Sequence, residues 1–363
     1  MDKAFEKYFL GANSGEGFVS HFGDSYNCFD GWRAFIIKGG PGTGKSSFMK
    51  YIAVKAADRG YEAVLCPCSS DPDSLDGLII KDLKTVIIDG TAPHTVEPVY
   101  PGACEEIINL GVFWNGDALY KNAEKIISVT NQNKKLHTAV SAYISAASEL
   151  VYDNFRLSRQ CADGKKVERF AENAAQRLIP KKANRKPREW VRFLCGITPR
   201  GIIAYSDTVE KFYKNIIVID DKYGGVSNTV MNTVRETALS RGYEIITVKN
   251  PFLPSKITDH ILIPELSLAF VREYEYMSFS KQYRRIHLRR FTDINAVRAV
   301  RNRITFNRRA ARELLLGAVN TLSKAKAVHD EIEKYYINAM DFGALTRFAE
   351  EKANQILSHS VKQ

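Results

Sequence analysis

Short apolar runs of strand length alternate with longer amphipathic stretches along this chain. The runs lie at residues 34–37, 63–68 and 85–89 in the first half, and at 217–219, 244–248 and 267–271 in the second. Strands that alternate with helices are typical of a parallel sheet covered by helices on both faces. The pattern therefore predicts an α/β fold built from three-layer domains.

A long helical segment is expected at the end of each half. Residues 118–162 and 167–178 close the first half, and residues 294–340 and 344–357 close the second. Within the first segment, apolar residues follow helical spacing at Leu136, Val140, Tyr143, Ile144 and Ala147. Such a stripe indicates packing between helices.

The two halves also resemble each other in sequence. Five segments match in the same order: residues 9–19 with 193–203, 35–37 with 217–219, 59–62 with 241–244, 79–83 with 262–266, and 169–172 with 347–350. Repetition at a nearly constant separation indicates a tandem duplication. We expect two domains, 1–182 and 183–363, joined by the basic, proline-bounded segment 180–188.

The first half carries a complete phosphate-binding loop of the pattern G-x-x-x-x-G-K-S. It follows the apolar run 34–37 and precedes the helix-like stretch 47–57, which is the setting that such a loop requires. Glycines let backbone N–H groups turn toward a polyphosphate, and the helix dipole adds to the attraction. The expected nucleotide contacts are Gly39, Gly40, Pro41, Gly42, Thr43, Gly44, Lys45, Ser46 and Ser47.

A second signal follows the loop at the apolar run 85–89, which ends in Asp89. A buried strand that delivers a carboxylate to the sheet edge is typical of a magnesium site in such proteins. We expect Ser46 and Asp89 to hold Mg²⁺, and Lys45 and Asp89 to be catalytic residues of an ATP site. The corresponding position in the second half is Arg272.

The second half has lost the matching loop chemistry. Gly44, Lys45 and Ser46 correspond to Val226, Ser227 and Asn228, and the carboxylates Asp220 and Asp221 precede them. These carboxylates would repel a triphosphate. The sequence therefore predicts one functional nucleotide site, in the first half, and a degenerate second copy.

The catalytic base is less sharply indicated. Asp71 and Asp73 are the preferred candidates, and Asp76 and His94 are further ones; all lie in segments that follow expected strands. Ligands bind at this edge of a parallel sheet. The alternative for the aspartates is a proline-centred turn with local capping, and for His94 a surface loop position.

Composition places the chain among ordinary folded proteins, with 363 residues, 45% of them hydrophobic and 26% charged. No apolar run reaches the length of a membrane span, and the N-terminus has no apolar signal core. The six cysteines, at Cys28, Cys66, Cys68, Cys104, Cys161 and Cys195, are scattered. We expect all six to be reduced thiols in a cytoplasmic protein without membrane partners.

The net charge of +11 is unevenly distributed, with −2 in residues 1–180 and +13 in residues 181–363. The segment 281–291 is basic with interleaved aromatic residues, and further arginines follow on the expected helix at Arg298, Arg301, Arg303, Arg308, Arg309 and Arg312. Such patches are typical of nucleic-acid binding. The alternative is a solvated helix face, or arginines paired with acidic groups of the first half.

The loop, the segments 68–77 and 89–94, and Tyr100–Ala103 together resemble a poorly characterised bacterial family of duplicated P-loop proteins. The resemblance covers about residues 5–115 and implies a P-loop fold and ATP binding. In that family the second copy often keeps its own loop, from which this chain departs. The expected function is a Mg²⁺-dependent ATPase. The alternatives are a small-molecule or nucleotide kinase and an ATP-gated nucleic-acid-binding protein.

Overall fold

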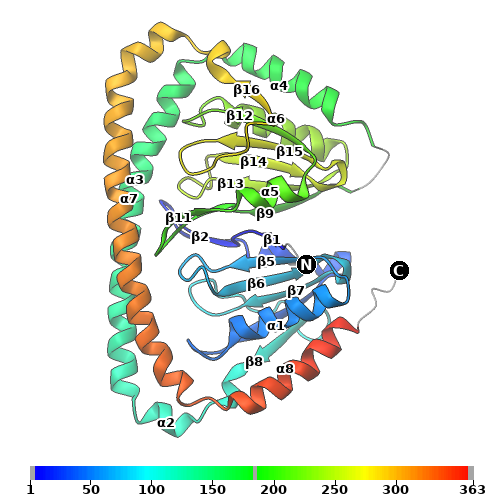
Figure 1. Cartoon of the computed structure of the whole chain (residues 1–363), viewed down its shortest axis with the longest axis vertical. Helices are drawn as coiled ribbons and strands as arrows, with labels where there is room; N and C mark the ends of the chain where they lie inside the picture. The colour runs from blue at the N-terminus through cyan, green and yellow to red at the C-terminus, as the bar shows by residue number, and fades with distance from the viewer. Residues whose placement is uncertain (1–4, 183–185, 359–363) are drawn as a thin grey trace.

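The computed structural model describes residues 5–182 and 186–358, and it contains two six-stranded sheets stacked one above the other (Figure 1). The expected α/β class is confirmed at this level. Residues 183–185, in the expected linker and at the expected domain boundary, lie outside the described residues.

The first sheet is mixed rather than parallel. Strand β6 runs antiparallel to both of its neighbours, β5 and β7, and the other pairs are parallel. The strand order is β1 (Glu6–Lys7), β5 (Ala63–Pro67), β6 (Leu75–Ile80), β7 (Thr85–Asp89), β4 (Arg33–Lys38) and β8 (Glu105–Asn109).

The second sheet has the same arrangement, with β14 antiparallel to β13 and β15. Its order is β9 (Arg188–Arg192), β13 (Glu244–Lys249), β14 (Thr258–Ile263), β15 (Leu268–Glu273), β12 (Asn215–Asp220) and β16 (Arg284–His287). The expectation of parallel sheets was wrong because β6 and β14 were missed. Each strand is buried along its whole length, so it has no alternating pattern, and each carries an aspartate, a residue depleted in strands.

Among the described residues, the helices that pack along the length of each sheet lie on its outer face. Helix α1 (Lys45–Asp58) buries residues spaced four apart, Phe48, Ile52 and Ala56, against the outer face of the first sheet. Helix α6 (Ser227–Ser240) does the same on the second sheet. The expected three-layer arrangement, with helices on both faces, is therefore corrected.

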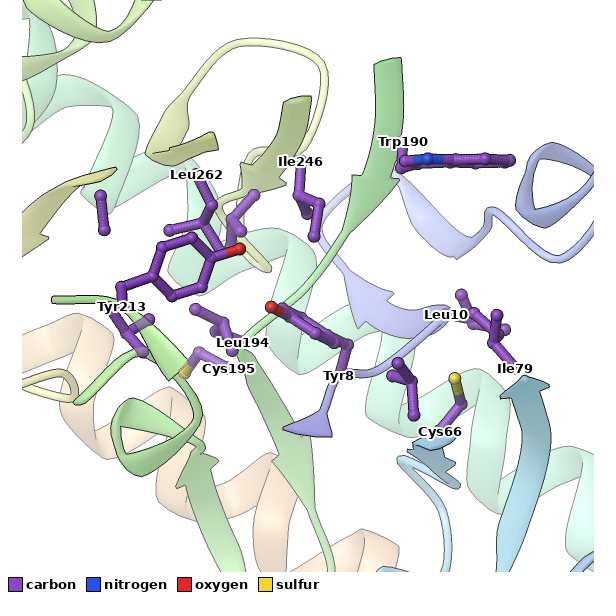
Figure 2. Packing of buried hydrophobic residues seen from close by; sticks show 14 of the residues in the cluster. Tyr8, Leu10, Cys66, Ile79, Trp190, Leu194, Cys195, Tyr213, Ile246 and Leu262 are labelled. Carbon is purple, nitrogen blue, oxygen red and sulfur yellow. The ribbon is translucent and has the colours of Figure 1, made fainter. Parts of the chain in front are cut away.

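The inner faces of the two sheets share one hydrophobic core. Tyr8, Leu10 and Cys66 of the first half pack into the same cluster as Leu194 and Tyr213 of the second (Figure 2). Two short hairpins lie at this junction, β2 (Gly11–Ser14) with β3 (Gly17–Ser20), and β10 (Cys195–Thr198) with β11 (Gly201–Ala204). The hydrophobic effect of this burial stabilises the two halves as one body.

Two long helices lie side by side along one edge of the molecule (Figure 1). They are α3 (Ala123–Gln160), preceded by the short α2 (Gly116–Tyr120), and α7 (Ile294–Ile337). The buried residues of α7 recur every seven positions, at Ile304, Ala311, Ala318, Ala325 and Ile332. This spacing is typical of a helix that packs along its length against another. The long helical segments expected from the sequence are confirmed.

The helices that follow this pair exchange between the halves. Helix α4 (Gly164–Leu178) packs on α6 and the second sheet, whereas α8 (Phe342–Leu357) packs on α1 and the first sheet. The side chains of Asp163 and Asp341 cap the two helices, because each accepts a hydrogen bond from the backbone N–H group three residues later in the chain. The last helix of each half thus completes the hydrophobic core of the other half. The remaining helix, α5 (Ser206–Phe212), is short.

The cysteines do not all remain thiols. Cys28 and Cys104 form a disulfide with a Cα–Cα distance of 5.8 Å. The expectation of six reduced thiols was wrong because these residues are 76 positions apart and meet only through the fold. Cys66, Cys68, Cys161 and Cys195 are free. None of the helices in the described part of the chain is long and apolar enough to span a bilayer.

Candidate functional site

The glycine-rich loop joins β4 to α1. Gly42 and Gly44 have φ of 67° and 87°, a left-handed conformation that favours glycine, and Gly44 is the N-cap of α1. The first N–H groups of a helix have no intrahelical partner. Within the described residues no side chain accepts a hydrogen bond from the N–H groups of residues 42–47. The loop therefore presents unpaired donors, as an anion site requires.

Lys45 and Ser46 lie at the start of α1. The Lys45 ammonium donates to the carbonyl of Gly40 at 2.8 Å and lies 3.6 Å from the Asp89 carboxylate. The Ser46 hydroxyl accepts a hydrogen bond from the Leu75 N–H at 2.9 Å. Thr43, which is buried, donates to the Gly40 carbonyl and holds the loop. Ser47 is exposed.

Asp89 reaches this loop through the register of the sheet. It pairs with Ile37 of the parallel strand β4, two residues before the loop begins. The Thr91 N–H and hydroxyl both donate to its Oδ1, at 2.9 and 2.6 Å. Its Oδ2 faces Lys45. The structure thus brings together the lysine and the aspartate that the sequence singled out.

Asp76 is a second buried carboxylate beside Asp89. It was not among the preferred candidates. It lies near the start of β6, and because β6 runs antiparallel to β7, this start lies at the edge where β7 ends. Burial, together with the charge of Asp89, raises the pKa of Asp76 to about 7, although a hydrogen bond with Cys68 opposes the shift.

His94 completes this group. Atoms of Asp76, Asp89 and His94 that could bind a metal ion lie within 4.8 Å of one another. The His94 ring stacks on Phe22 with centroids 4.4 Å apart, and burial lowers the pKa of His94. Lys38, at the end of β4, holds the loop that carries His94 through the carbonyls of Gly90 and Val96, both at 2.8 Å.

The preferred candidates Asp71 and Asp73 lie in the turn before β6. The Asp71 carboxylate accepts from the Ser74 hydroxyl at 2.9 Å and lies 3.4 Å from Lys326 of α7. The Asp73 side chain is 70% exposed and pairs with Arg200. Neither belongs to the group of Asp76, Asp89 and His94.

The C-terminal turns of α7 lie against the phosphate loop. A methyl group added at Gly40 would come within 2.5 Å of the Tyr336 ring, and one at Gly42 within 2.9 Å of the Glu333 carbonyl oxygen. The second half therefore does reach the first loop. It does so through α7, and no local pattern in the sequence could have indicated that contact.

The second loop, between β12 and α6, is filled by its own carboxylate. Asp221 is buried and accepts from the N–H groups of Val226 and Ser227 at 2.9 and 2.7 Å. It occupies the position that an anion would take at the start of α6. Here α3 covers the loop, because a methyl group at Gly225 would meet the Arg159 nitrogen at 2.6 Å.

In the second half, an ion pair stands in place of the two carboxylates Asp76 and Asp89. Asp259 of β14 and Arg272 of β15 form a buried ion pair at 2.8 Å. A small cavity of about 70 Å³ is lined in part by Arg272 of this pair and by Lys222 and Tyr223 of the second loop. A larger cavity, about 410 Å³, is lined by residues 33–35 and 101–107 and includes no residue of either loop.

The basic segment of the second half is partly engaged in ion pairs. Arg285 pairs with Glu273, and Arg303 pairs with Asp153 of α3 at 2.7 Å. The other arginines of α7 singled out by the sequence are exposed, namely Arg298, Arg301, Arg308, Arg309 and Arg312. Nucleic-acid binding and kinase activity both stay predictions.

Comparison of the chain with protein-family models, with curated proteins and with solved structures gives no match.

Proposed function

We propose that this protein binds ATP with Mg²⁺ in the loop of the first half and hydrolyses it, and that the second half carries a degenerate copy of the site. One contrast carries the proposal. The start of α1 presents unpaired N–H groups beside Lys45 and Asp89, whereas the start of α6 is occupied by the Asp221 carboxylate. A polyphosphate is the ligand for which such a loop is suited.

Each residue has a role in this proposal that follows from its position. Lys45 would leave the Gly40 carbonyl to bind the β- and γ-phosphates. Ser46 and Asp89 would hold Mg²⁺, and this ion would neutralise charge that develops on the transferred phosphoryl group. Asp76 and His94 lie beside Asp89, whereas the exposed Asp73 pairs with Arg200.

We further infer that both halves are P-loop-like domains that arose by tandem duplication, with 1–182 and 183–363 as the repeated units. The support is the shared strand order, with β6 and β14 antiparallel at the same place. Equivalent hydrogen bonds add to it. Leu75 N–H donates to Ser46, and Thr258 N–H donates to Asn228, both at 2.9 Å.

Nucleotide binding to point variants tests the proposal. We expect Lys45→Met to weaken Mg²⁺–ATP binding by about 100-fold or more, equivalent to about 3 kcal/mol, because the loop loses the Lys45 ammonium that would bind the phosphates. Asp89→Asn should weaken the Mg²⁺ dependence of binding and abolish turnover. Calorimetric titration and phosphate release provide the measurements.

Lys222→Met is the matched control, because Lys222 is a lysine of the second loop. This variant should bind and hydrolyse ATP as the parent chain does. Unchanged affinity in Lys45→Met, or an equal loss in Lys222→Met, contradicts the assignment of the site.

A further inference from the structure

Asp76, Asp89 and His94 can each offer one ligand atom to a metal ion, and all three are buried. The Lys45 ammonium lies 3.6 Å from Asp89. Its single charge offsets only one of the two carboxylates. Buried charges are costly unless they are paired, so the group requires a second positive charge when both aspartates are ionised.

His94 supplies an independent indication. It is 6% exposed, and neither ring nitrogen has a hydrogen-bond partner among the described residues. Its Nε2 lies 3.9 Å from Asp89 Oδ1, so the ring is directed at the carboxylates. A buried polar group without a partner is unfavourable, because it has lost its hydrogen bonds to water. A ligand bound at this nitrogen would offset that loss.

The second half shows how the fold neutralises the same place without an ion. Asp259 lies on β14 as Asp76 lies on β6, but its neighbour on β15 is Arg272, at 2.8 Å. The guanidinium supplies the positive charge inside the protein. In the first half the corresponding residue is Asp89, and the imidazole of His94 is added.

We propose that Asp76, Asp89 and His94 bind a first-row transition-metal ion of the Mn²⁺ or Zn²⁺ class, with His94 as a nitrogen ligand. Mg²⁺ takes oxygen ligands and retains several waters, whereas an imidazole favours transition metals. Phe22 and Lys38 hold the histidine in place for this role. The inference rests on the proposed function only in that the ion would serve the nucleotide site beside it.

Titration of the full chain with MnCl₂ in the absence of nucleotide tests the inference. Electron paramagnetic resonance should detect one bound Mn²⁺ per chain, with a nitrogen coupling from the imidazole. His94→Phe keeps the ring stacking but removes the nitrogens, so the coupling should vanish and the affinity should fall by about 10-fold or more. Asp76→Asn should also weaken binding.

His21→Phe is the matched control, since His21 lies in the same half but outside the group. It should retain both affinity and coupling, and circular dichroism should show all variants folded. Failure to bind Mn²⁺, equal displacement by Mg²⁺, or a coupling that persists in His94→Phe overturns the inference. If the metal inference failed in this way, nucleotide binding that depends on Lys45 would still support the proposed function. Conversely, Mn²⁺ binding in a chain that does not bind nucleotide would support the metal site and contradict the proposed function.

Discussion

At the scale of residues, the Asp221 carboxylate is one of the differences between the two loops. At the separation that aligns the phosphate loops, Asp221 corresponds to Gly39. Asp221 pairs with two N–H groups at the start of α6, whereas a glycine has no side chain to place there. The same position therefore leaves one anion site free and fills the other from within. Likewise, Arg272 stands in the second half where Asp89 stands in the first, and its guanidinium supplies a positive charge from within the protein.

This difference predicts a stability effect in the second loop. Asp221→Ala removes a buried acceptor of three backbone hydrogen bonds, from Tyr223, Val226 and Ser227, and should lower the free energy of unfolding by about 1–3 kcal/mol. Denaturant unfolding measures it. Asp220→Ala is the control, because the Asp220 side chain is half exposed and pairs with the exposed His287. Equal effects of the two substitutions would contradict the role assigned to Asp221.

At the scale of elements, the pair of long helices has a fixed register. Asn307 of α7 donates to Asn154 of α3 at 3.1 Å, and Asn154 donates to the Ile304 carbonyl at 3.3 Å. A polar contact within an apolar helix interface specifies which turns face each other. The register in turn sets where each helix ends, and each end lies on a loop at Gly42 or Gly225.

The close contact at Gly225 gives a prediction for these elements. Gly225→Ala would place a methyl group 2.6 Å from the Arg159 nitrogen, so α3 and the second loop must separate. We expect a loss of about 1–3 kcal/mol in unfolding free energy, as for other overpacked sites. Gly116→Ala in α2, where the added atom meets nothing within 4 Å, should change stability by less than about 1 kcal/mol. Similar changes in unfolding free energy for the two variants would contradict the close contact between α3 and the second loop.

At the scale of the whole molecule, neither half is complete alone. Helix α8 finishes the outer layer of the first sheet and α4 that of the second, while the inner faces share a core (Figures 1 and 2). The long helices cross between the halves, so each loop is covered by the end of a helix that begins beside the other sheet. A ligand at the first loop must therefore contact or displace α7.

Hydrogen–deuterium exchange should detect this coupling. Under the proposed function, Mg²⁺–ATP changes exchange in the last turns of α7, residues 326–337, because they overlie Gly40 and Gly42. The last turns of α3, residues 153–160, are the internal control and should not respond, since Asp221 already fills the loop they cover. A response confined to α3, or equal at both ends, would contradict the one-site arrangement.

The amino-acid sequence by itself determined the features that depend on neighbouring residues. Periodicity located the long helices, and parallel strands bring together Gly39–Ser46 and Asp89, the two segments singled out from the sequence as a candidate site. The helices could be predicted because a helix is specified within one short segment.

Only the tertiary structure decided the rest of the candidate site. Asp76 joins Asp89 because β6 is antiparallel, His94 enters through a loop held by Lys38, and α7 reaches Gly42 from the far end of the chain. The disulfide between Cys28 and Cys104 has the same origin. The physical reason is that the environment of each side chain arises from contacts between segments distant in sequence, which local patterns do not encode.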